Sequence, residues 1–462
     1  MPTAQDTTIF ASHALLSSGW AENVRIDLSA NGTVSGVETG ANSSAGADHK
    51  AGILLPAPSN LHSHAFQRAM AGMSERRGQE SRDSFWTWRQ IMFRFLDTLT
   101  PDDVEAIAAF VQMEMLEGGY AGVGEFHYLH HQPGGEPYGN LAEISERIVS
   151  AASATGIGLT LLPVLYTHGG CDKRPLAPGQ IRFGNAFDRF QKLHDQAGNA
   201  LKSLDQDCIL GVAPHSLRAV DVEGLLNAVA LAGQKPLHMH LAEQVAEVEE
   251  VLAAVGKRPV EWLLENHGVS ANWCLIHCTQ MTPEETRGLA ATGAVAGLCP
   301  ITESSLGDGI FEGVRYLEAG GKFGVGSDSN IRISLSEELR TLEYSQRLRD
   351  KCRASVATPD KSTGRVLFDG AVSGSAQACG RKSGQIAPGC FADLVALDAG
   401  AIDLEGRAGD EILDAYIFAG DDRMVQDVWS AGRHVVTGGT HVKGDEIRAR
   451  YRSTMSALRA RL

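Results

Sequence analysis

The sequence lacks the features that mark membrane proteins, nucleic-acid-binding proteins and disulfide-rich secreted proteins. No run approaches the ~18 uninterrupted apolar residues of a membrane span. Lys and Arg number only 41 against 56 Asp and Glu, a formal charge of −15, whereas nucleic acids and anionic membranes select basic partners. The eight Cys form no CxxC motif, and the first residues, MPTAQDTTIF, contain no Lys or Arg, unlike a signal peptide. We therefore expect a cytoplasmic protein with reduced thiols and no nucleic-acid or membrane partner.

Apolar residues make up 43% of the whole chain. Along its middle, short apolar runs alternate with helical patterns. Most of the candidate strands are apolar throughout, as expected of strands covered on both faces. They are Ile53–Leu61, Ala121–Phe126, Leu159–Tyr166, Ile209–Pro214, Pro236–Leu241, Trp273–His277, Ala294–Leu298 and Lys322–Gly326. Eight strands, each followed by a helix, predict a (β/α)8 barrel. The alternative, an open doubly wound sheet, would normally bring a GxGxxG turn, which is absent.

The two ends of the chain have a different pattern, with strand-like alternation and turn residues in 8–52 and in Ile386–Val442. We expect them to combine into one small β-sandwich domain beside the barrel. The predicted parts are 1–52 and 386–462 for the small domain and 53–385 for the barrel. Helices are predicted at Asp102–Leu116, Val245–Leu264, Pro283–Ala291 and Asp445–Leu462. The Arg residues of the last helix are interpreted as a solvated face.

Side chains that bind metals recur at the ends of the predicted strands. In NLHSH, His62 and His64 project to the same side of a strand end. His240 ends the fifth strand, His277 ends the sixth, and Asp328 follows the eighth. Because the chemistry of these barrels gathers at the C-terminal ends of the strands, we expect the five side chains to converge. Imidazole and carboxylate groups suit zinc or Fe(II), and without a metal the cluster would be a costly set of desolvated polar groups.

A carboxylate also follows one of these predicted ligands, since Glu243 lies three residues after His240. A carboxylate in this place can take a proton from water and deliver it to a leaving group. The structural alternatives are that Glu243 favours a helix dipole and that Asp328 caps a helix. His127, His130 and His131 are interpreted as support for the loop after the second strand, and His168 is placed at the mouth of the barrel without a role.

Longer motifs give the chain a resemblance to a known family. LLPAPSNLHSHAFQR, HLAEQ, LIHCTQM, GVGSDSN and PGCFADLVALD, spread over essentially the whole chain, resemble the amidohydrolase superfamily. Within it, NLHSHAFQRAMAG, DSFWTWR, GEFHYLHH, PVLYTHGG and APHSLRAV resemble the formimidoylglutamate deiminases of histidine breakdown. The resemblance implies hydrolytic deamination of N-formimino-L-glutamate to N-formyl-L-glutamate and ammonia, by a homodimer.

The resemblance also implies one zinc ion per chain, with Fe2+ as the other ion considered. The implied ligands are His62, His64, His240 and Asp328. His277 matches the histidine that contacts the attacking water, Glu243 matches the proton-shuttling glutamate, and Asp328 is also expected to hold the water. The fourth strand, around Gly211–Pro214, lacks the bridging Lys of binuclear members, which favours a single metal.

The implied substrate carries two carboxylates and a formamidine. Because a net charge of −15 repels such a dianion, the pocket must be locally basic. Arg89, in the aromatic segment Phe85–Phe95, and Arg218, after the fourth strand, are suited to bidentate pairs with carboxylates, and the family uses arginines at the matching positions. The remaining recognition positions of the family match Gln67, Tyr128 and His215.

Two other interpretations stay open at this point. The first is another aminohydrolase of the same fold that acts on a cyclic heteroaromatic amine, against which a pocket selective for dianions would argue. The second is a non-catalytic barrel that serves as a binding or scaffold protein. The joint presence of Glu243 with all five metal-site residues disfavours the second.

Overall fold

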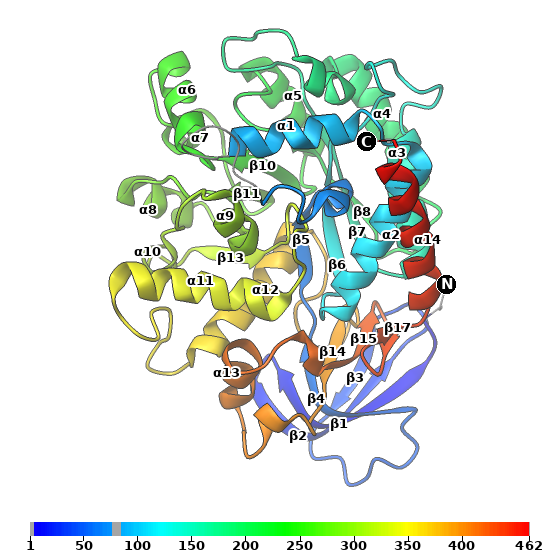
Figure 1. The fold of residues 1–462 in the computed structure, drawn as a ribbon. Coiled ribbons are helices and arrows are strands. Elements are labelled where there is room, and N and C mark those ends of the chain that lie inside the picture. Colours follow the sequence, from blue (N-terminus) through cyan, green and yellow to red (C-terminus); the bar gives the residue numbers. More distant parts are fainter. Residues whose placement is uncertain (1–3, 76–84, 462) are drawn as a thin grey trace.

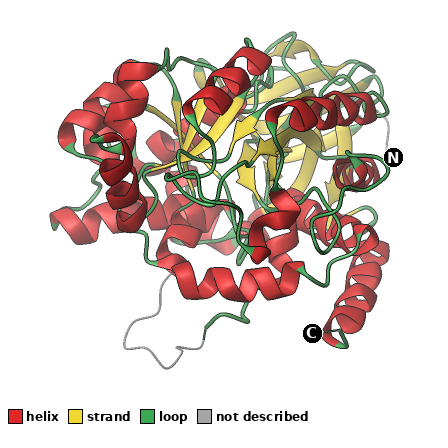
Figure 2. Cartoon of the chain, turned by 90° about the horizontal axis from the view of Figure 1, so that it is seen from above, coloured by secondary structure: helices red, strands yellow, loops and turns green. Residues whose placement is uncertain are grey.

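The computed structural model describes residues 4–75 and 85–461, with a ring of short parallel strands at its centre (Figures 1 and 2). The ring consists of β5 (Ser59–Ser63), β6 (Gly122–His127), β7 (Gly158–Leu165), β8 (Ile209–Leu210), β9 (Ala213–Pro214), β10 (Leu237–Leu241), β11 (Trp273–His277), β12 (Val295–Leu298) and β13 (Lys322–Val325). One arc runs from β5 to β8, with β9 also on β7, and the other runs from β10 to β13. Parallel bridges Val212–Leu237 and Ser63–Asp328 join the two arcs, so the strands form the predicted barrel.

The first predicted strand, Ile53–Leu61, is wrong as a single element. The backbone forms β4 (His49–Pro56) and β5, which belong to different sheets. The break falls at Ala57 and Pro58, and Pro58 has no N–H with which to continue a ladder. The later predicted strands are confirmed within a few residues, the fourth as the two short pieces β8 and β9.

Helices cover the outside of the ring (Figure 2). They are η1 (Ala65–Met70), α1 (Phe85–Leu96), α2 (Pro101–Glu117), α3 (Glu143–Thr155), η2 (Pro178–Phe183), α4 (Phe187–Leu201), α5 (Val222–Ala232), α6 (Val245–Val255), α7 (Pro259–Asn266), α8 (Pro283–Ala291), α9 (Pro300–Leu306), α10 (Gly313–Glu318), α11 (Leu335–Asp350) and α12 (Thr363–Ala378). Asp83 and Ser84, the first residues of the DSFWTWR motif, lie outside the described residues.

Local sequence signals explain where these helices start and stop. Thr100 accepts a hydrogen bond from Asp103 N and Asp103 caps Thr100 in return, which starts α2 at Pro101. The prediction of one helix over Val245–Leu264 is wrong. Gly256 ends α6 with a left-handed φ of 76°, and Pro259 begins α7.

Both ends of the chain contribute to one eight-stranded sheet below the barrel (Figure 1). Its order is β17-β16-β15-β14-β4-β1-β2-β3. The strands are β1 (Thr7–Leu16), β2 (Gly19–Leu28), β3 (Val34–Glu38), β4, β14 (Leu394–Leu397), β15 (Val425–Ser430), β16 (Arg433–Thr437) and β17 (Thr440–His441). The stretch Ile386–Val442 is not all strand, because η3 (Ile402–Leu404), α13 (Asp410–Phe418) and η4 (Asp422–Met424) interrupt it.

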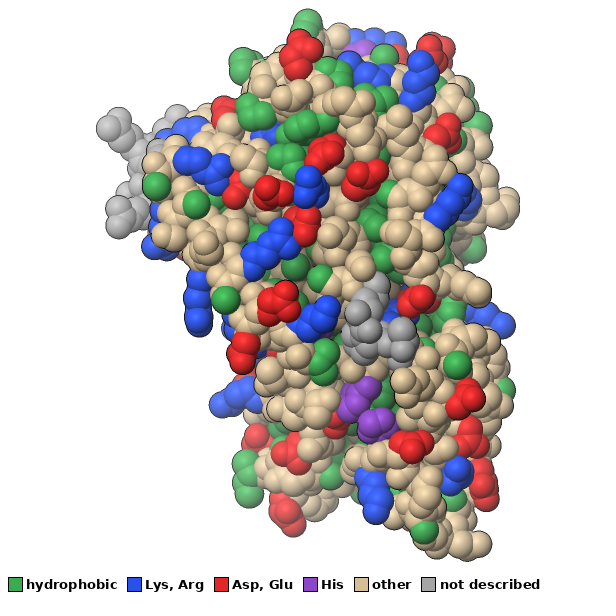
Figure 3. All heavy atoms as spheres, turned by 90° about the vertical axis from the view of Figure 1, so that its right-hand side faces the viewer, with side chains coloured by type: hydrophobic (Ala, Val, Ile, Leu, Met, Phe, Trp, Pro, Cys, Tyr) green, Lys and Arg blue, Asp and Glu red, His purple; other side chains and the backbone are tan. Residues whose placement is uncertain are grey.

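The predicted C-terminal helix is α14 (Gly444–Arg459), and it packs against α2. Its arginines are not simply solvated, since Arg448 Nη2 lies 2.6 Å from Glu117 Oε1 and Arg450 Nη1 lies 2.7 Å from Glu105 Oε1. Positive and negative side chains are interspersed on this face (Figure 3). The eight cysteines all lie in the described part and are free thiols. Among the described helices, none has the length and apolar character needed to cross a membrane.

Candidate active site

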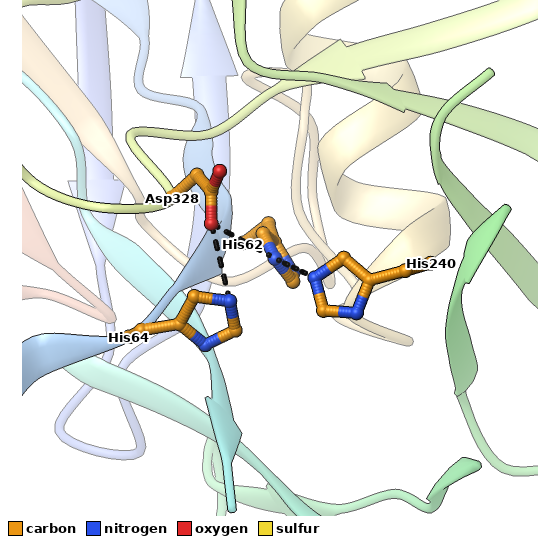
Figure 4. Close-up of side chains that lie close together, drawn as sticks. All are labelled: His62, His64, His240 and Asp328. Carbon is orange, nitrogen blue, oxygen red and sulfur yellow. Dashed lines mark hydrogen bonds and ion pairs between the residues drawn. The ribbon is translucent and has the colours of Figure 1, made fainter. Parts of the chain in front are cut away.

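Four buried side chains from three separate parts of the ring meet at one point (Figure 4). His62 lies on β5, His64 directly after it, His240 on β10, and Asp328 after β13. His62 Nε2 lies 3.1 Å from His240 Nε2, and Asp328 Oδ1 lies 3.1 Å from His64 Nε2 and 3.4 Å from His62 Nε2. The four potential ligand atoms all lie within 4.8 Å of one another.

The protonation and orientation of these groups fit a divalent cation. Burial lowers the pKa of His62 to about 3 and that of His240 well below its usual range, so both rings are neutral and present lone pairs. His64 Nδ1 lies 2.9 Å from Phe126 O, and His240 Nδ1 lies 3.2 Å from His215 O. Backbone carbonyls of this kind orient metal-binding imidazoles. The two Nε2 atoms, 3.1 Å apart, are close enough to bind one cation together.

The backbone around Asp328 is shaped to bring its carboxylate to the histidines. Asp328 has a left-handed φ of 46°, and Asp328 N donates to His62 O at 2.9 Å. A Cβ on Gly326 would lie 2.6 Å from His62 N, so only glycine allows this approach. Asn330 Nδ2 donates to Ser63 Oγ and to Asp328 O, both at 3.1 Å. The loop after β13 is therefore tied to β5 beside the four grouped side chains.

Glu243 and His277 lie beside this cluster. His277 Nε2 is 3.9 Å from Glu243 Oε1 and 3.8 Å from Asp328 Oδ2. Burial raises the pKa of Glu243 above its usual range. Burial alone would lower the pKa of His277, but Glu243, Glu303 and Asp328 outweigh it and raise the pKa to about 10. The ring is then a hydrogen-bond donor at both nitrogens.

A pocket beside these groups is lined by the predicted recognition residues. They are Gln67, Arg89, Tyr128, His215 and Arg218. Gln67 Nε2 donates to Tyr128 Oη at 2.6 Å, and Arg89 Nη2 donates to Tyr166 Oη at 3.0 Å. Glu243, His277 and Asp328 form another part of the same wall. The sequence prediction that these residues share one site therefore agrees with their placement.

Other histidines lie apart from the pocket. His130 Nε2 lies 2.9 Å from Val164 O, and His131 Nε2 lies 3.0 Å from Gly184 O, so these rings support the loop after β6. His127 is buried next to His130. His168 does not line this pocket, and its Nε2 lies 3.5 Å from Asp221 Oδ2.

Comparisons with known proteins agree with this geometry. A model described as the amidohydrolase family matches residues 53–435. The chain belongs to the amidohydrolase family. A second model, described as the N-terminal domain of formimidoylglutamate deiminase HutF, matches residues 6–51 of this amidohydrolase. The resemblance based on sequence motifs is therefore confirmed.

Individual relatives of this amidohydrolase cover almost the whole chain. It is 47% identical over 446 residues to formimidoylglutamate deiminase from Pseudomonas aeruginosa, a match that covers 96% of this chain and 97% of the relative. A solved amidohydrolase from Brucella melitensis has a TM-score of 0.94 at 47% identity, covering 98% of this chain and 99% of that one. An adenosine deaminase from Xanthomonas campestris with bound zinc has a TM-score of 0.81 at 20% identity over 100% of both chains, which shows a shared fold.

Two side chains of the amidohydrolase site were not predicted from the sequence. Glu303, on α9, lies with Oε1 3.2 Å from His277 Nδ1, and Tyr166, directly after β7, lines the pocket. Both follow the C-terminal end of a barrel strand, which is the signal that led to the predicted metal ligands. Applying that signal to every strand end would have found them.

Proposed function

We propose that this amidohydrolase hydrolyses N-formimino-L-glutamate to N-formyl-L-glutamate and ammonia. The observation that carries the proposal is one pocket in which Arg89 and Arg218 accompany Glu243 and a cluster suited to a metal. The two arginines fit a dianion, and Glu243 with the cluster fits hydrolysis of a C–N bond. The 47% identical relative from Pseudomonas aeruginosa is a formimidoylglutamate deiminase, which supports the same substrate.

The ligand set supports one zinc ion per chain. Three imidazole nitrogens and one carboxylate oxygen are ligands that zinc commonly takes, and Fe2+ accepts the same set. Such an ion lowers the pKa of water, so that a hydroxide nucleophile is available near neutral pH. His62, His64, His240 and Asp328 would hold it.

The reaction then needs two proton transfers, and the buried carboxylates provide them. Glu243 accepts a proton from the attacking water while a new C–O bond forms at the formimino carbon. Asp328 accepts a hydrogen bond from the same water, and His277 Nε2 donates to the developing charge. Glu243 passes this proton to the formimino nitrogen, which becomes an amino group. The proton left on the new hydroxyl then passes to the same nitrogen through Asp328, while the C–N bond breaks, the C=O bond forms and ammonia leaves. One water is consumed, and the formimino C=N becomes the formyl C=O.

Recognition of the substrate is assigned to the other wall of the pocket. Arg89 and Arg218 pair with the two carboxylates and compensate for the net charge of −15. One end of the Gln67 amide contacts Tyr128 Oη at 2.6 Å, while Oε1 has no partner among the described residues. That buried acceptor suits an N–H of the amidine. Burial, with a smaller effect of Arg218, holds the pKa of His215 well below its usual range, so its ring binds as a neutral group.

The direct test measures ammonia and N-formyl-L-glutamate released by the zinc-loaded protein from N-formimino-L-glutamate. Adenosine and cytosine are offered in parallel, since a related fold carries an adenosine deaminase. The proposal predicts stoichiometric ammonia and N-formyl-L-glutamate from the formimino compound alone. Ammonia release from a heteroaromatic amine, without turnover of N-formimino-L-glutamate, would assign the protein to the other class of aminohydrolase. No turnover of any of them would favour a binding role.

A further inference from the structure

The hydroxyl group of Tyr166 occupies an unusual position among the polar groups of the pocket. Tyr166 is almost completely buried, and its side chain lines the pocket. Arg89 Nη2 donates to its Oη at 3.0 Å, and Gln180 Nε2 donates to the same oxygen at 2.7 Å. A phenol oxygen has two lone pairs and one hydrogen. Both lone pairs are therefore in use.

The direction of the Gln180 amide is fixed independently. Gln180 Oε1 accepts a hydrogen bond from Ala177 N at 2.9 Å, at the start of η2. Its NH2 group must therefore face Tyr166, and it acts there as a donor. Arg89 can only donate, because a guanidinium has no acceptor. Tyr166 cannot give its own proton to either neighbour.

The proton of Tyr166 consequently has no acceptor among the described residues, although the group is buried. Leaving a buried donor without a partner is costly, and such groups usually mark the place of a ligand or a water. Tyr166 also lies close enough to Arg218 for the two groups to interact electrostatically. The hydroxyl thus stands near both arginines to which we assign the carboxylates of the substrate.

We propose that Tyr166 is a substrate-binding residue whose O–H donates to the carboxylate held by Arg89. This inference rests on the proposed function and deepens it. Arg89 supplies charge, while Tyr166 supplies a directed, uncharged donor that is fixed by Arg89 and Gln180 before the ligand arrives. Together they require an anionic acceptor at this end of the pocket. A heteroaromatic amine would not satisfy these two converging donors.

The alternative role for Tyr166 is mechanical, since its oxygen also helps to hold Arg89. The two roles predict different results when Tyr166→Phe is made in the unaltered protein and in the Arg89→Met variant. If Tyr166 acts only through Arg89, Tyr166→Phe has no further effect once Arg89 is replaced by Met. If Tyr166 donates to the ligand itself, Tyr166→Phe weakens binding in both backgrounds.

The experiment measures kcat and KM with N-formimino-L-glutamate, and dissociation constants for N-formyl-L-glutamate by calorimetry, on zinc-loaded proteins. Tyr166→Phe should raise KM and the dissociation constant by about 10- to 100-fold, because a hydrogen bond to a charged group is lost. Its kcat should stay within about threefold, since ground state and transition state lose the bond equally. In the Arg89→Met background, a further weakening of about 10-fold is expected. Tyr344→Phe, on the exposed side of α11, is the matched control.

Unchanged KM in Tyr166→Phe, or no further weakening in the Arg89→Met background, would overturn the inference while leaving the proposed function intact. If the unaltered protein does not turn over N-formimino-L-glutamate, the proposed function fails instead. Glutarate then replaces the product as the probe. Weaker glutarate binding by Tyr166→Phe would keep the donor role, and equal or absent binding would remove it.

Discussion

His277 Nδ1 lies 3.2 Å from Glu303 Oε1, and both groups are buried beside the metal cluster. The same carboxylate oxygen accepts a hydrogen bond from Cys299 N at 2.8 Å, so the backbone of α9 fixes its position. Glu303 therefore holds His277 through Nδ1 and fixes the orientation of the ring. Nε2 is left to face Glu243 and Asp328, at 3.9 and 3.8 Å.

Glu303→Gln tests whether this pairing serves the reaction. Glutamine keeps the size of the side chain but removes the charge that favours a protonated His277. We expect kcat to fall about 10- to 100-fold with KM nearly unchanged, as for other groups that orient catalytic imidazoles. Metal content, measured by elemental analysis, should stay the same. Glu284→Gln, at an exposed site on α8, is the control, and an equal loss of kcat in it would argue against a specific role.

Glu243→Gln removes the proposed proton carrier and preserves its shape. General acid–base groups contribute about 10²- to 10⁴-fold to rates, so kcat should fall by that amount. Binding of N-formyl-L-glutamate and of the metal should change little, because Glu243 is not among the four grouped ligands. Steady-state kinetics and calorimetry check both parts. Full retention of kcat would remove Glu243 from the mechanism.

Arg218→Met tests the pairing with a carboxylate. Arg218 is buried, so its replacement exchanges a charged donor in a water-poor site for an apolar chain of similar length. KM should rise about 10- to 100-fold, in line with a charge-assisted hydrogen bond, with a smaller change in kcat. The preference for a dicarboxylate over its monoamide should shrink in parallel. An unchanged KM would mean that Arg218 has a structural role.

Asp207 carries a separate prediction about stability, far from the chemistry. Its Oδ2 lies 2.8 Å from Arg381 Nη2 and 2.7 Å from Arg433 Nη2, which joins the barrel to β16 of the small sheet. Burial alone would raise the pKa of Asp207, but the two guanidinium groups lower it from 3.8 to about 2. Because the folded pKa lies below the unfolded one, this stabilisation is present above pH ~4 and is lost as the pH falls towards 2.

Asp207→Asn should therefore destabilise the protein at pH 7 by about 3–5 kcal/mol, since two buried arginines lose their shared partner. The difference from the unaltered protein should shrink between pH 4 and pH 2. Urea unfolding at pH 7, 4 and 3 measures it. A difference that does not depend on pH would show that the charge of Asp207 is not what stabilises the junction.

The sequence predicts the barrel and its site well, because strand ends carry the chemistry in this architecture. His62, His240 and Asp328 are distant in the chain, but their places after apolar strands define a common face. Local signals also exist for features that were predicted wrongly. Gly256 and Pro259 are typical of a helix end and a helix start, and together they divide the predicted helix.

Other features depend on contacts that no local pattern encodes. The run that contains Pro56 and Pro58 is apolar on both sides, so periodicity cannot assign β4 to one sheet and β5 to another. Glu303 and Tyr166 follow strand ends, but the roles assigned to them depend on their contacts with His277 and Gln180, which come from other elements. The direction of a hydroxyl proton follows only from the positions of all its neighbours.

A crystal structure of the zinc-loaded protein, with anomalous scattering, shows whether His62, His64, His240 and Asp328 share one ion. We expect a single peak per chain, with about 2.0–2.1 Å to three imidazole nitrogens and about 2.0–2.2 Å to one Asp328 oxygen. A peak elsewhere, or no bound metal after expression in zinc-supplemented medium, would contradict it.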